Sequence, residues 1–353
     1  ILLMSLDAES RSMMLESADR LLTDLCTPEL VNRAEKGEWP EQLWSAIEDA
    51  GLTLIAVPEE AGGVGGSLAD LCAVLRLLGA HAVPAPAAET ALARHVGALA
   101  GLDLPQGPLS VGFSATPLQL AADARRASGD IAAAPWAAST KGIVAIGRAA
   151  SGEGRAVLID PKAVASTANN SAGEPRGRFR NGDLPVSASV PTTLTAADAY
   201  ALAALMRVQQ MAGAAARCLE ICLAYSRERK QFGRPIGNFQ AVQQLLAELA
   251  GQVAAVQSAA ESAADLAGTG PLPVAAAKVR ASDNAGRICA MAHQVLGAMG
   301  FTYEHRLHHF TRRLWAWRDE FGSDTAWANE IGRMVAADGA DALWPLLTGY
   351  KPD

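Results

Sequence analysis

The chain has 353 residues, half of them hydrophobic, and a formal net charge of −7. A chain of this length can bury a large core and form two or three domains. The negative charge argues against nucleic acid or an anionic membrane surface as the main partner. No apolar run approaches the length needed to span a bilayer.

The N-terminal stretch ILLMSLDAESRSMM lacks a basic segment followed by an apolar core, so we expect a cytoplasmic protein. The five cysteines, which lie among apolar residues and show no CxxC pairing, are Cys26, Cys72, Cys218, Cys222 and Cys289. This pattern predicts reduced thiols in the core rather than disulfides or a zinc site.

Residues 1–107 are expected to form an N-terminal α-helical domain. Pro40 opens one of its helices, whose buried stripe is Leu43, Trp44 and Ile47. The run LTLIAVPEEAGGVGG that follows imitates a dinucleotide-binding turn, but the third glycine of a GxGxxG motif is missing. We interpret it as a glycine-rich connection to the next helix.

Residues 108–194 differ from the rest of the chain in their pattern of apolar and turn-forming residues. Short apolar runs such as LSVGF, GIVAIG and AVLID are separated by Gly, Asn, Ser and Pro. This alternation predicts a small middle β domain.

Residues 195–353 predict an antiparallel bundle of long, alanine-rich helices. The expected helices are 196–229, 238–266, 275–299, 304–318 and 326–337. Alanine-rich faces allow close helix approach and often leave stripes for a partner subunit, so an oligomer is expected. The predicted fold class is α+β, with the helical domain, the β domain and the bundle in chain order.

A polar corner joins the first two bundle helices, where glycines and prolines interrupt the sequence AYSRERKQFGRPIGNFQAVQ. Asn238 can cap the second helix. Arg229, Lys230, Gln231 and Phe232 would project from this corner, and such a set suits a phosphate group beside an aromatic ring. The alternative is a solvated helix end with ordinary dipole complementarity.

The run RERKQFGRPIGNFQAVQ resembles the signature of the acyl-CoA dehydrogenase family, flavoenzymes that oxidise the alpha–beta bond of an acyl-CoA thioester. LWSAIEDAGLTLIAVPEEAGGVGG resembles the N-terminal helix and loop of this family, and HQVLGAMGFTYEHRLHHFTRR resembles its C-terminal cofactor segment. The resemblance implies the acyl-CoA dehydrogenase fold, FAD as cofactor, an acyl-CoA substrate, and electron-transfer flavoprotein as acceptor. It also implies a dimer or a dimer of dimers.

In the family, a subunit reaches across a dimer interface to the ADP part of its neighbour's FAD. The positions that match these contacts are Arg229, Gln231, Phe232, Phe239, Gln240, Gln294, Gly297 and Ala298. Trp136, in the stretch PWAAST, is the nearest counterpart of a tryptophan beside the flavin. The family's Gly-Ser-Asp and Trp-Ile-Thr elements are absent, so a core tryptophan is an equal alternative.

The acyl site itself lacks the expected residues. Dehydrogenation needs a base beside the alpha carbon, and the two places where family members carry this glutamate read Phe321 and Ala203. Glu320 is the nearest candidate base, although one step along a helix turns a side chain by about 100 degrees. Alanines replace the acid and arginine that anchor CoA, and only Arg207 is placed to substitute.

The chain thus keeps residues that it would lend to a neighbour and lacks those of its own site. This pattern resembles the smaller or degenerate subunit of the heteromeric α2β2 acyl-CoA dehydrogenases of steroid side-chain breakdown. A self-sufficient homomeric enzyme with Glu320 as base, and a non-enzymatic assembly partner, are the alternatives. His305, His308 and His309 have metal-like spacing, but no carboxylate or cysteine cluster supports them, so no metal is expected.

Overall fold

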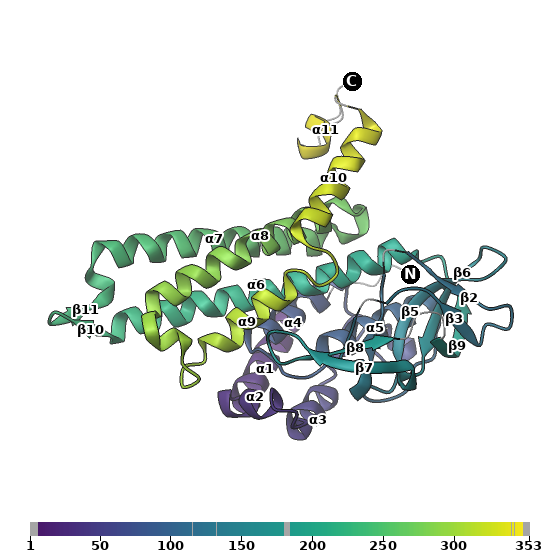
Figure 1. Cartoon of the computed structure of the whole chain (residues 1–353), viewed down its shortest axis with the longest axis horizontal. Helices are drawn as coiled ribbons and strands as arrows, with labels where there is room; N and C mark the ends of the chain where they lie inside the picture. Colours follow the sequence, from purple (N-terminus) through teal and green to yellow (C-terminus); the bar gives the residue numbers. More distant parts are fainter. Residues whose placement is uncertain are drawn as a thin grey trace.

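The structure, a computed structural model, describes residues 6–114, 116–131, 133–179, 184–339, 341 and 343–348. N-terminal helices, a β region and a C-terminal helical bundle follow one another along the chain (Figure 1). The predicted α+β architecture is confirmed. Within the described ranges, no helix is long and apolar enough to cross a membrane.

The N-terminal part is built of amphipathic helices. They are α1 (Ala8–Leu25), α2 (Pro28–Ala34), α3 (Glu41–Asp49), α4 (Leu68–Ala80) and α5 (Ala87–Ala100). α3 buries Leu43, Trp44 and Ile47, as the periodicity predicts. The glycine-rich stretch before α4 is a compact turn held by backbone hydrogen bonds to residues 54–58.

The β region contains a small barrel and a separate sheet. Its strands are β1 (Ser110–Val111), β2 (Leu118–Leu120), β3 (Arg126–Ser128), β4 (Ala134–Pro135), β5 (Ile143–Arg148), β6 (Gly154–Ile159), β7 (Val164–Asn169), β8 (Pro175–Phe179) and β9 (Leu184–Pro191). Six strands pair in the order β1-β5-β2-β3-β9-β6, and the additional pairing of β5 with β6 closes the barrel. β4, β8 and β7 form the second, antiparallel sheet.

The C-terminal bundle consists of long helices in alternating directions. They are α6 (Ala196–Glu228), α7 (Gln240–Leu266), α8 (Leu272–Leu296), α9 (Leu307–Trp317) and α10 (Asp324–Asp338), followed by the short α11 (Leu343–Thr348). Each long helix begins at or close to its predicted position. Asn238 does not cap α7, because it lies in a 3-10 turn and the helix starts after Phe239.

α4 crosses α6 at two glycines. A Cβ on Gly79 would collide with the backbone of Gln210, and a Cβ on Gly213 would collide with the carbonyl of Arg76. Only glycine permits this approach of the two backbones. The crossing holds the N-terminal helices against the middle of α6, next to Arg207.

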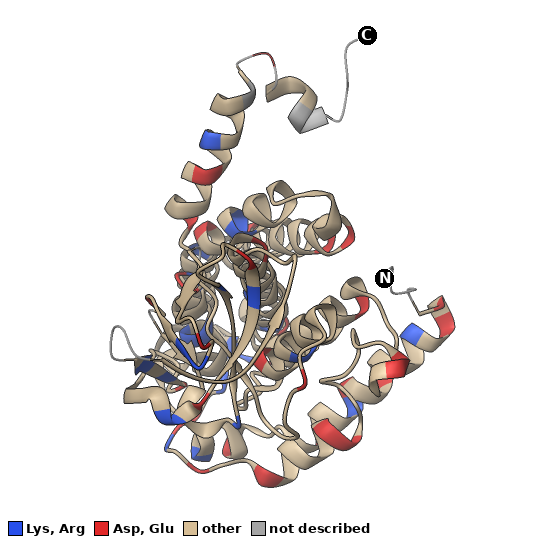
Figure 2. Cartoon of the chain, turned by 90° about the vertical axis from the view of Figure 1, so that its right-hand side faces the viewer, with Lys and Arg blue, Asp and Glu red and all other residues tan. Residues whose placement is uncertain are grey.

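α10 and α11 project from the body of the molecule (Figure 1). Figure 2 shows acidic and basic residues interspersed along this arm and along the N-terminal helices. All five cysteines are free, four of them buried and Cys26 partly so, which agrees with the predicted core thiols. Burial raises the pKa of the Cys26 thiol to about 12.

Candidate functional site

The predicted cofactor residues of the bundle lie at one end of it. α6 and α8 finish there and α7 begins there (Figure 1). Between α6 and α7 the chain forms a small hairpin of β10 (Lys230–Gln231) and β11 (Arg234–Pro235). The Tyr225 and His305 rings, 6.2 Å apart, connect α6 to the segment that follows α8.

Most of the predicted ADP-contacting side chains at this bundle end face solvent. The exposed ones are Arg229, Gln231, Phe232, Gln240, Gln294, Gly297 and Ala298, while Phe239 is half-buried. Phe232 is 92% exposed. Its ring meets that of Phe239 edge-on at 6.1 Å, and the Arg234 guanidinium lies 4.2 Å from the Phe239 centroid. Phe232 is thus almost fully accessible at this bundle end.

The chemistry of this bundle end fits the ADP half of a flavin dinucleotide. A guanidinium binds a pyrophosphate with charge-assisted hydrogen bonds, and an aromatic face can stack on adenine. Gly297 has φ 58 and ψ −140, and a Cβ there would meet nothing within 4 Å. The turn after α8 therefore presents bare backbone beside the amide of Gln294.

Three aromatic residues singled out by the sequence have a strained backbone. Among the described non-glycine residues, a positive φ occurs at Ala82, Ala124, Trp136, Phe232 and Phe321. A bulky side chain pays for this conformation in strain, and such outliers cluster at functional sites. Two of these strained residues, Phe232 and Phe321, lie in the exposed corner and in the turn after α9.

Trp136 lies apart from the bundle end. It follows β4, is buried, and its backbone N–H donates to the carbonyl of Pro175 at 2.8 Å. β8, the partner of β4, lies away from the β10–β11 hairpin (Figure 1). The structure therefore does not bring Trp136 together with Arg229 and Phe232.

Glu320, the candidate base, is clasped by two arginines. One carboxylate oxygen accepts from Nε of Arg176 at 2.8 Å, and the other accepts from Nε of Arg207 at 2.8 Å. Asn170 donates to the first oxygen at 3.3 Å. The Glu320 side chain is 18% exposed. Both oxygens are thus engaged within the protein.

The ion pairs of Glu320 with these two arginines belong to a larger, mostly buried network of charged side chains. Arg207 also pairs with Glu89 at 2.7 Å, and Arg176 pairs with Glu174 at 2.8 Å. The network contains four acids and four arginines: Glu35, Glu89, Glu174, Glu320, Arg176, Arg207, Arg312 and Arg313. The acids and the arginines of this network are therefore equal in number.

The network makes Glu320 a weaker base than an ordinary glutamate. Burial by itself would raise the pKa of Glu320, but the positive charges of Arg176 and Arg207 outweigh it, so the pKa lies below its usual value. A base that removes the alpha proton needs a raised pKa and a free oxygen. Glu320 has neither in this arrangement, and its assignment as base stays a prediction.

The two other base positions are filled by apolar groups. Ala203 is fully buried in the core. Phe321 packs edge-on against Tyr200 at 6.1 Å, and the Arg207 guanidinium lies 5.7 Å from its ring. Arg207 itself is 1% exposed and its donors are taken by Glu89, Glu320 and Gln210. It is not presented to a CoA phosphate.

The three histidines near α9 face different environments. The His308 and His309 rings are 4.2 Å apart, and His309 is hydrogen-bonded to Asn32 at 2.9 Å. His305 instead packs on Tyr225. No cluster of metal-ligating side chains is found in the part of the chain that the structure describes.

Sequence reasoning did not identify Glu89, Glu174, Arg176 or Arg313. None of them stands in a sequence motif that marks a buried ion pair. The available signal was their position: Glu89 falls in a run of alanines, and Arg313 falls on the helical face that also carries Phe310 and Trp317. A charge at such a position needs a buried partner.

The chain matches two family models, described as the acyl-CoA dehydrogenase N-terminal domain over residues 8–101 and the C-terminal domain over residues 196–335. Acyl-CoA dehydrogenase IpdE2 of Mycolicibacterium smegmatis is 30% identical over 312 residues, which cover 87% of this chain and 92% of that protein. Two solved structures share the fold. The Tcur3481-Tcur3483 steroid ACAD variant has a TM-score of 0.85 at 23% identity, over 94% of this chain and 99% of that chain. The ChsE4-ChsE5 complex from Mycobacterium tuberculosis has a TM-score of 0.81 at 24% identity, over 94% and 98% respectively.

Proposed function

Because the chain belongs to the acyl-CoA dehydrogenase family, whose members are oxidoreductases acting on the CH–CH bond of acyl-CoA, we propose a specific role within it. The chain is a subunit that supplies FAD-binding residues to a different, catalytic acyl-CoA dehydrogenase chain. Its contribution is to bind and orient the flavin rather than to remove the substrate proton.

The observation that carries this proposal is that the candidate base, Glu320, is engaged by other side chains. Phe321 and Ala203 stand at the base positions, and Arg176 and Arg207 occupy both oxygens of Glu320. The Phe321 turn borders a cavity of about 440 Å³, but Glu320 is not among its lining residues. A base must reach the proton that it removes.

The open bundle end supports the other half of the proposal. Arg229 would neutralise the pyrophosphate, and Phe232 with Phe239 would pack on the adenosine. Gln231, Gln240 and Gln294 would complete the hydrogen bonds. FAD, when bound, accepts the hydride from the beta carbon. These groups belong to the helix ends of the bundle, so the flavin would lie against a second chain.

A hetero-oligomer follows if this chain supplies flavin-binding residues and a different chain supplies the catalytic base. The two solved structures described above are each named for a pair of chains, and one of them is named as a steroid ACAD. We propose a bulky, steroid-type acyl-CoA as the substrate of the assembled enzyme and electron-transfer flavoprotein as its acceptor. A cytoplasmic location belongs to the same proposal.

The test is to purify the chain alone and co-expressed with the product of its neighbouring gene, and to measure native mass and flavin content. We expect a complex of unlike chains with fewer flavins than polypeptides. A homo-oligomer that holds one FAD per chain and oxidises acyl-CoA unaided would favour the Glu320 enzyme instead. A complex without flavin would favour the assembly partner.

A further inference from the structure

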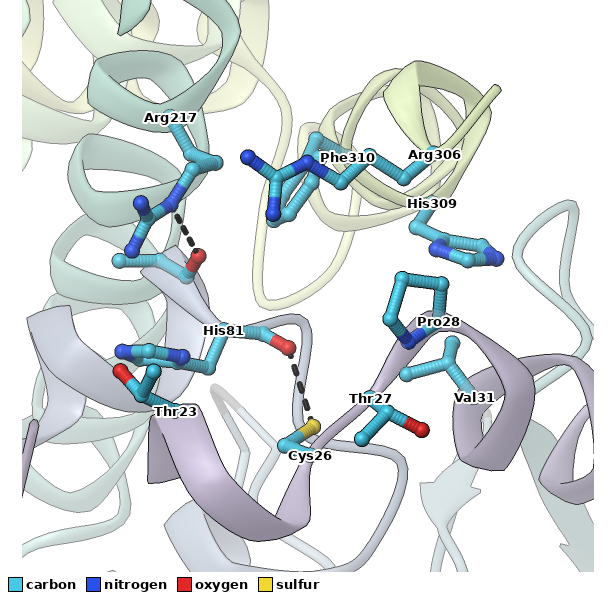
Figure 3. A pocket seen from close by; sticks show the side chains of 11 residues that line it. Thr23, Cys26, Thr27, Pro28, Val31, His81, Arg217, Arg306, His309 and Phe310 are labelled. Carbon is cyan, nitrogen blue, oxygen red and sulfur yellow. Dashed lines mark hydrogen bonds between the residues drawn. The ribbon is translucent and has the colours of Figure 1, made fainter. Parts of the chain in front are cut away.

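We propose that a cavity between the N-terminal helices and the bundle, away from the flavin corner, is a binding site for a small oxyanion of the phosphate class. The cavity lies where the α1–α2 connection, the end of α4, the middle of α6 and the start of α9 meet. Figure 3 shows the side chains that line it. This site is independent of the flavin-lending function proposed above.

Two guanidinium groups face each other across the cavity. Arg217 extends from α6, and Arg306, which precedes α9, reaches toward it from the opposite wall (Figure 3). Arg217 is fixed in place, because its Nε donates to the Ala80 carbonyl at 3.0 Å and it pairs with Glu220 at 2.8 Å. The first arginine is therefore preorganised for a ligand.

Arg306 lacks such partners. Among the residues that the structure describes, no hydrogen bond or ion pair engages its guanidinium, which reaches over the cavity from an exposed position at the rim. Burial lowers the pKa of Arg306, and the nearby charge of Arg217 lowers it further. Glu220, which pairs with Arg217, offsets part of the repulsion between the two guanidinium groups. An oxyanion placed between them would be attracted to both.

The lining contains donors but no carboxylate. It comprises Thr23, Cys26, Thr27, Pro28, Val31, Ala80, His81, Arg217, Arg306, His309 and Phe310. The nearest acid to His81, Asp19, already accepts from that ring at 2.7 Å. The Thr27 hydroxyl oxygen accepts from the Leu30 N–H, which leaves the hydroxyl hydrogen free to donate. Hydroxyl and guanidinium donors together match the acceptor oxygens of an oxyanion.

The size of the cavity limits the ligand. Its volume is about 160 Å³. This space holds several water molecules, and therefore a phosphate group, but it does not hold a nucleotide. The ligand is either free phosphate or the terminal phosphate of a larger molecule whose remainder stays outside.

The experiment is calorimetric titration of the purified full chain, alone and with its partner chain, with inorganic phosphate at constant ionic strength. We expect saturable binding with one phosphate per chain. Arg306→Gln should raise the dissociation constant about tenfold or more, because it removes a charge-assisted hydrogen bond. Arg306→Lys keeps the charge and should raise it less. Arg287→Gln, on an exposed arginine of α8, is the matched control and should leave binding unchanged.

The two sources of phosphate are separated by competition. A phosphate monoester such as glycerol 3-phosphate that displaces inorganic phosphate identifies an ester as the ligand, and failure to displace it identifies free phosphate; either result supports the site. Arg217→Gln tests the second cation, with thermal unfolding to confirm that the variant folds. Absence of saturable phosphate binding to the unmodified chain overturns the proposal, and so does equal binding by Arg306→Gln.

Discussion

At the scale of single residues, two arginines of the same helix region have opposite surroundings. Arg229 is exposed at the end of α6, and none of the described residues pairs with its guanidinium. Arg207 is buried and bonded to Glu89, Glu320 and Gln210. Only the first is available to a phosphate of a cofactor, because removing the second from its partners would leave buried charges uncompensated.

Replacing Arg229 with alanine should lower the flavin content of the assembled enzyme. The change removes a charge-assisted contact to the pyrophosphate, which is worth about 1.5 to 3 kcal/mol. Flavin absorbance per mole of purified complex measures the effect. Arg227→Ala removes another exposed arginine of the same helix end and should keep the flavin. Full occupancy in Arg229→Ala would remove the basis of the cofactor assignment.

Glu320→Gln should leave turnover of the assembled enzyme almost unchanged but should destabilise the chain. The amide keeps the shape of the carboxylate but leaves Arg176 and Arg207 without its charge, at a cost on the order of 2 kcal/mol. Urea unfolding and acyl-CoA-dependent flavin bleaching measure the two effects. Glu330→Gln breaks an exposed pair with Arg333 and should change stability by less than about 1 kcal/mol. A loss of several hundredfold in turnover for Glu320→Gln would identify Glu320 as the base.

At the scale of the elements, two side chains of α8 cap the C-terminal end of α9. Nζ of Lys278 donates to the carbonyls of Trp317 at 3.0 Å and Arg318 at 2.8 Å, and the Ser282 hydroxyl donates to the Arg318 carbonyl at 2.8 Å. The last carbonyls of a helix lack partners within it, and a lysine there also complements the helix dipole. Lys278 is completely buried. Its Nζ atom holds the turn that leads to Glu320.

This cap should make stability depend on pH in the alkaline range. Burial lowers the pKa of Lys278 from 10.5 to about 7. Between these values the unfolded chain binds more protons than the folded chain, so the free energy of unfolding should rise with pH, by at most about 1.4 kcal/mol per unit. Lys278→Met should flatten the rise between pH 7 and 10 in urea unfolding. An identical pH dependence in both proteins would contradict the prediction.

The helices were far easier to predict from the sequence than the pairings between distant strands and side chains. Repeating apolar positions along α6, α7 and α8 are local signals, so the sequence located these helices closely. The order of strands in the barrel depends on pairings between distant segments, which no local pattern contains. The partners of Arg207, at 113 and 118 residues along the chain, are equally non-local. The sequence predicted the exposed corner at Arg229 to Phe232 as a cofactor site only because its residues are contiguous and resemble a family signature.

At the scale of the whole molecule, the charge network connects all three parts of the chain. Glu35 and Glu89 come from the N-terminal helices, Glu174 and Arg176 come from the β region, and the remaining members come from the bundle and the turn that follows α9. The Trp317 indole N–H adds a hydrogen bond to Glu174 at 3.0 Å. Buried ion pairs of this kind fix the relative positions of the parts that they join.

Acid should therefore loosen the attachment of the three parts. Burial alone would raise the pKa of Glu174, but Arg176, Arg313 and Arg207 lower it to about 2, against an ordinary 4.5. The stabilisation is present above pH 4.5 and is lost as the pH falls toward 2, by at most about 1.4 kcal/mol per unit. Thermal unfolding between pH 6 and 3 should show this decline, and Glu174→Gln should reduce it. A decline as steep in the variant would assign it to other groups.

The balance of charges around Glu320 also constrains how this chain can evolve. A glutamate at position 321 would bring a fifth carboxylate beside Glu320, whose oxygens already pair with Arg176 and Arg207. We expect such a chain to be less stable before it is active, because Arg207 and Arg176 would first have to release Glu320.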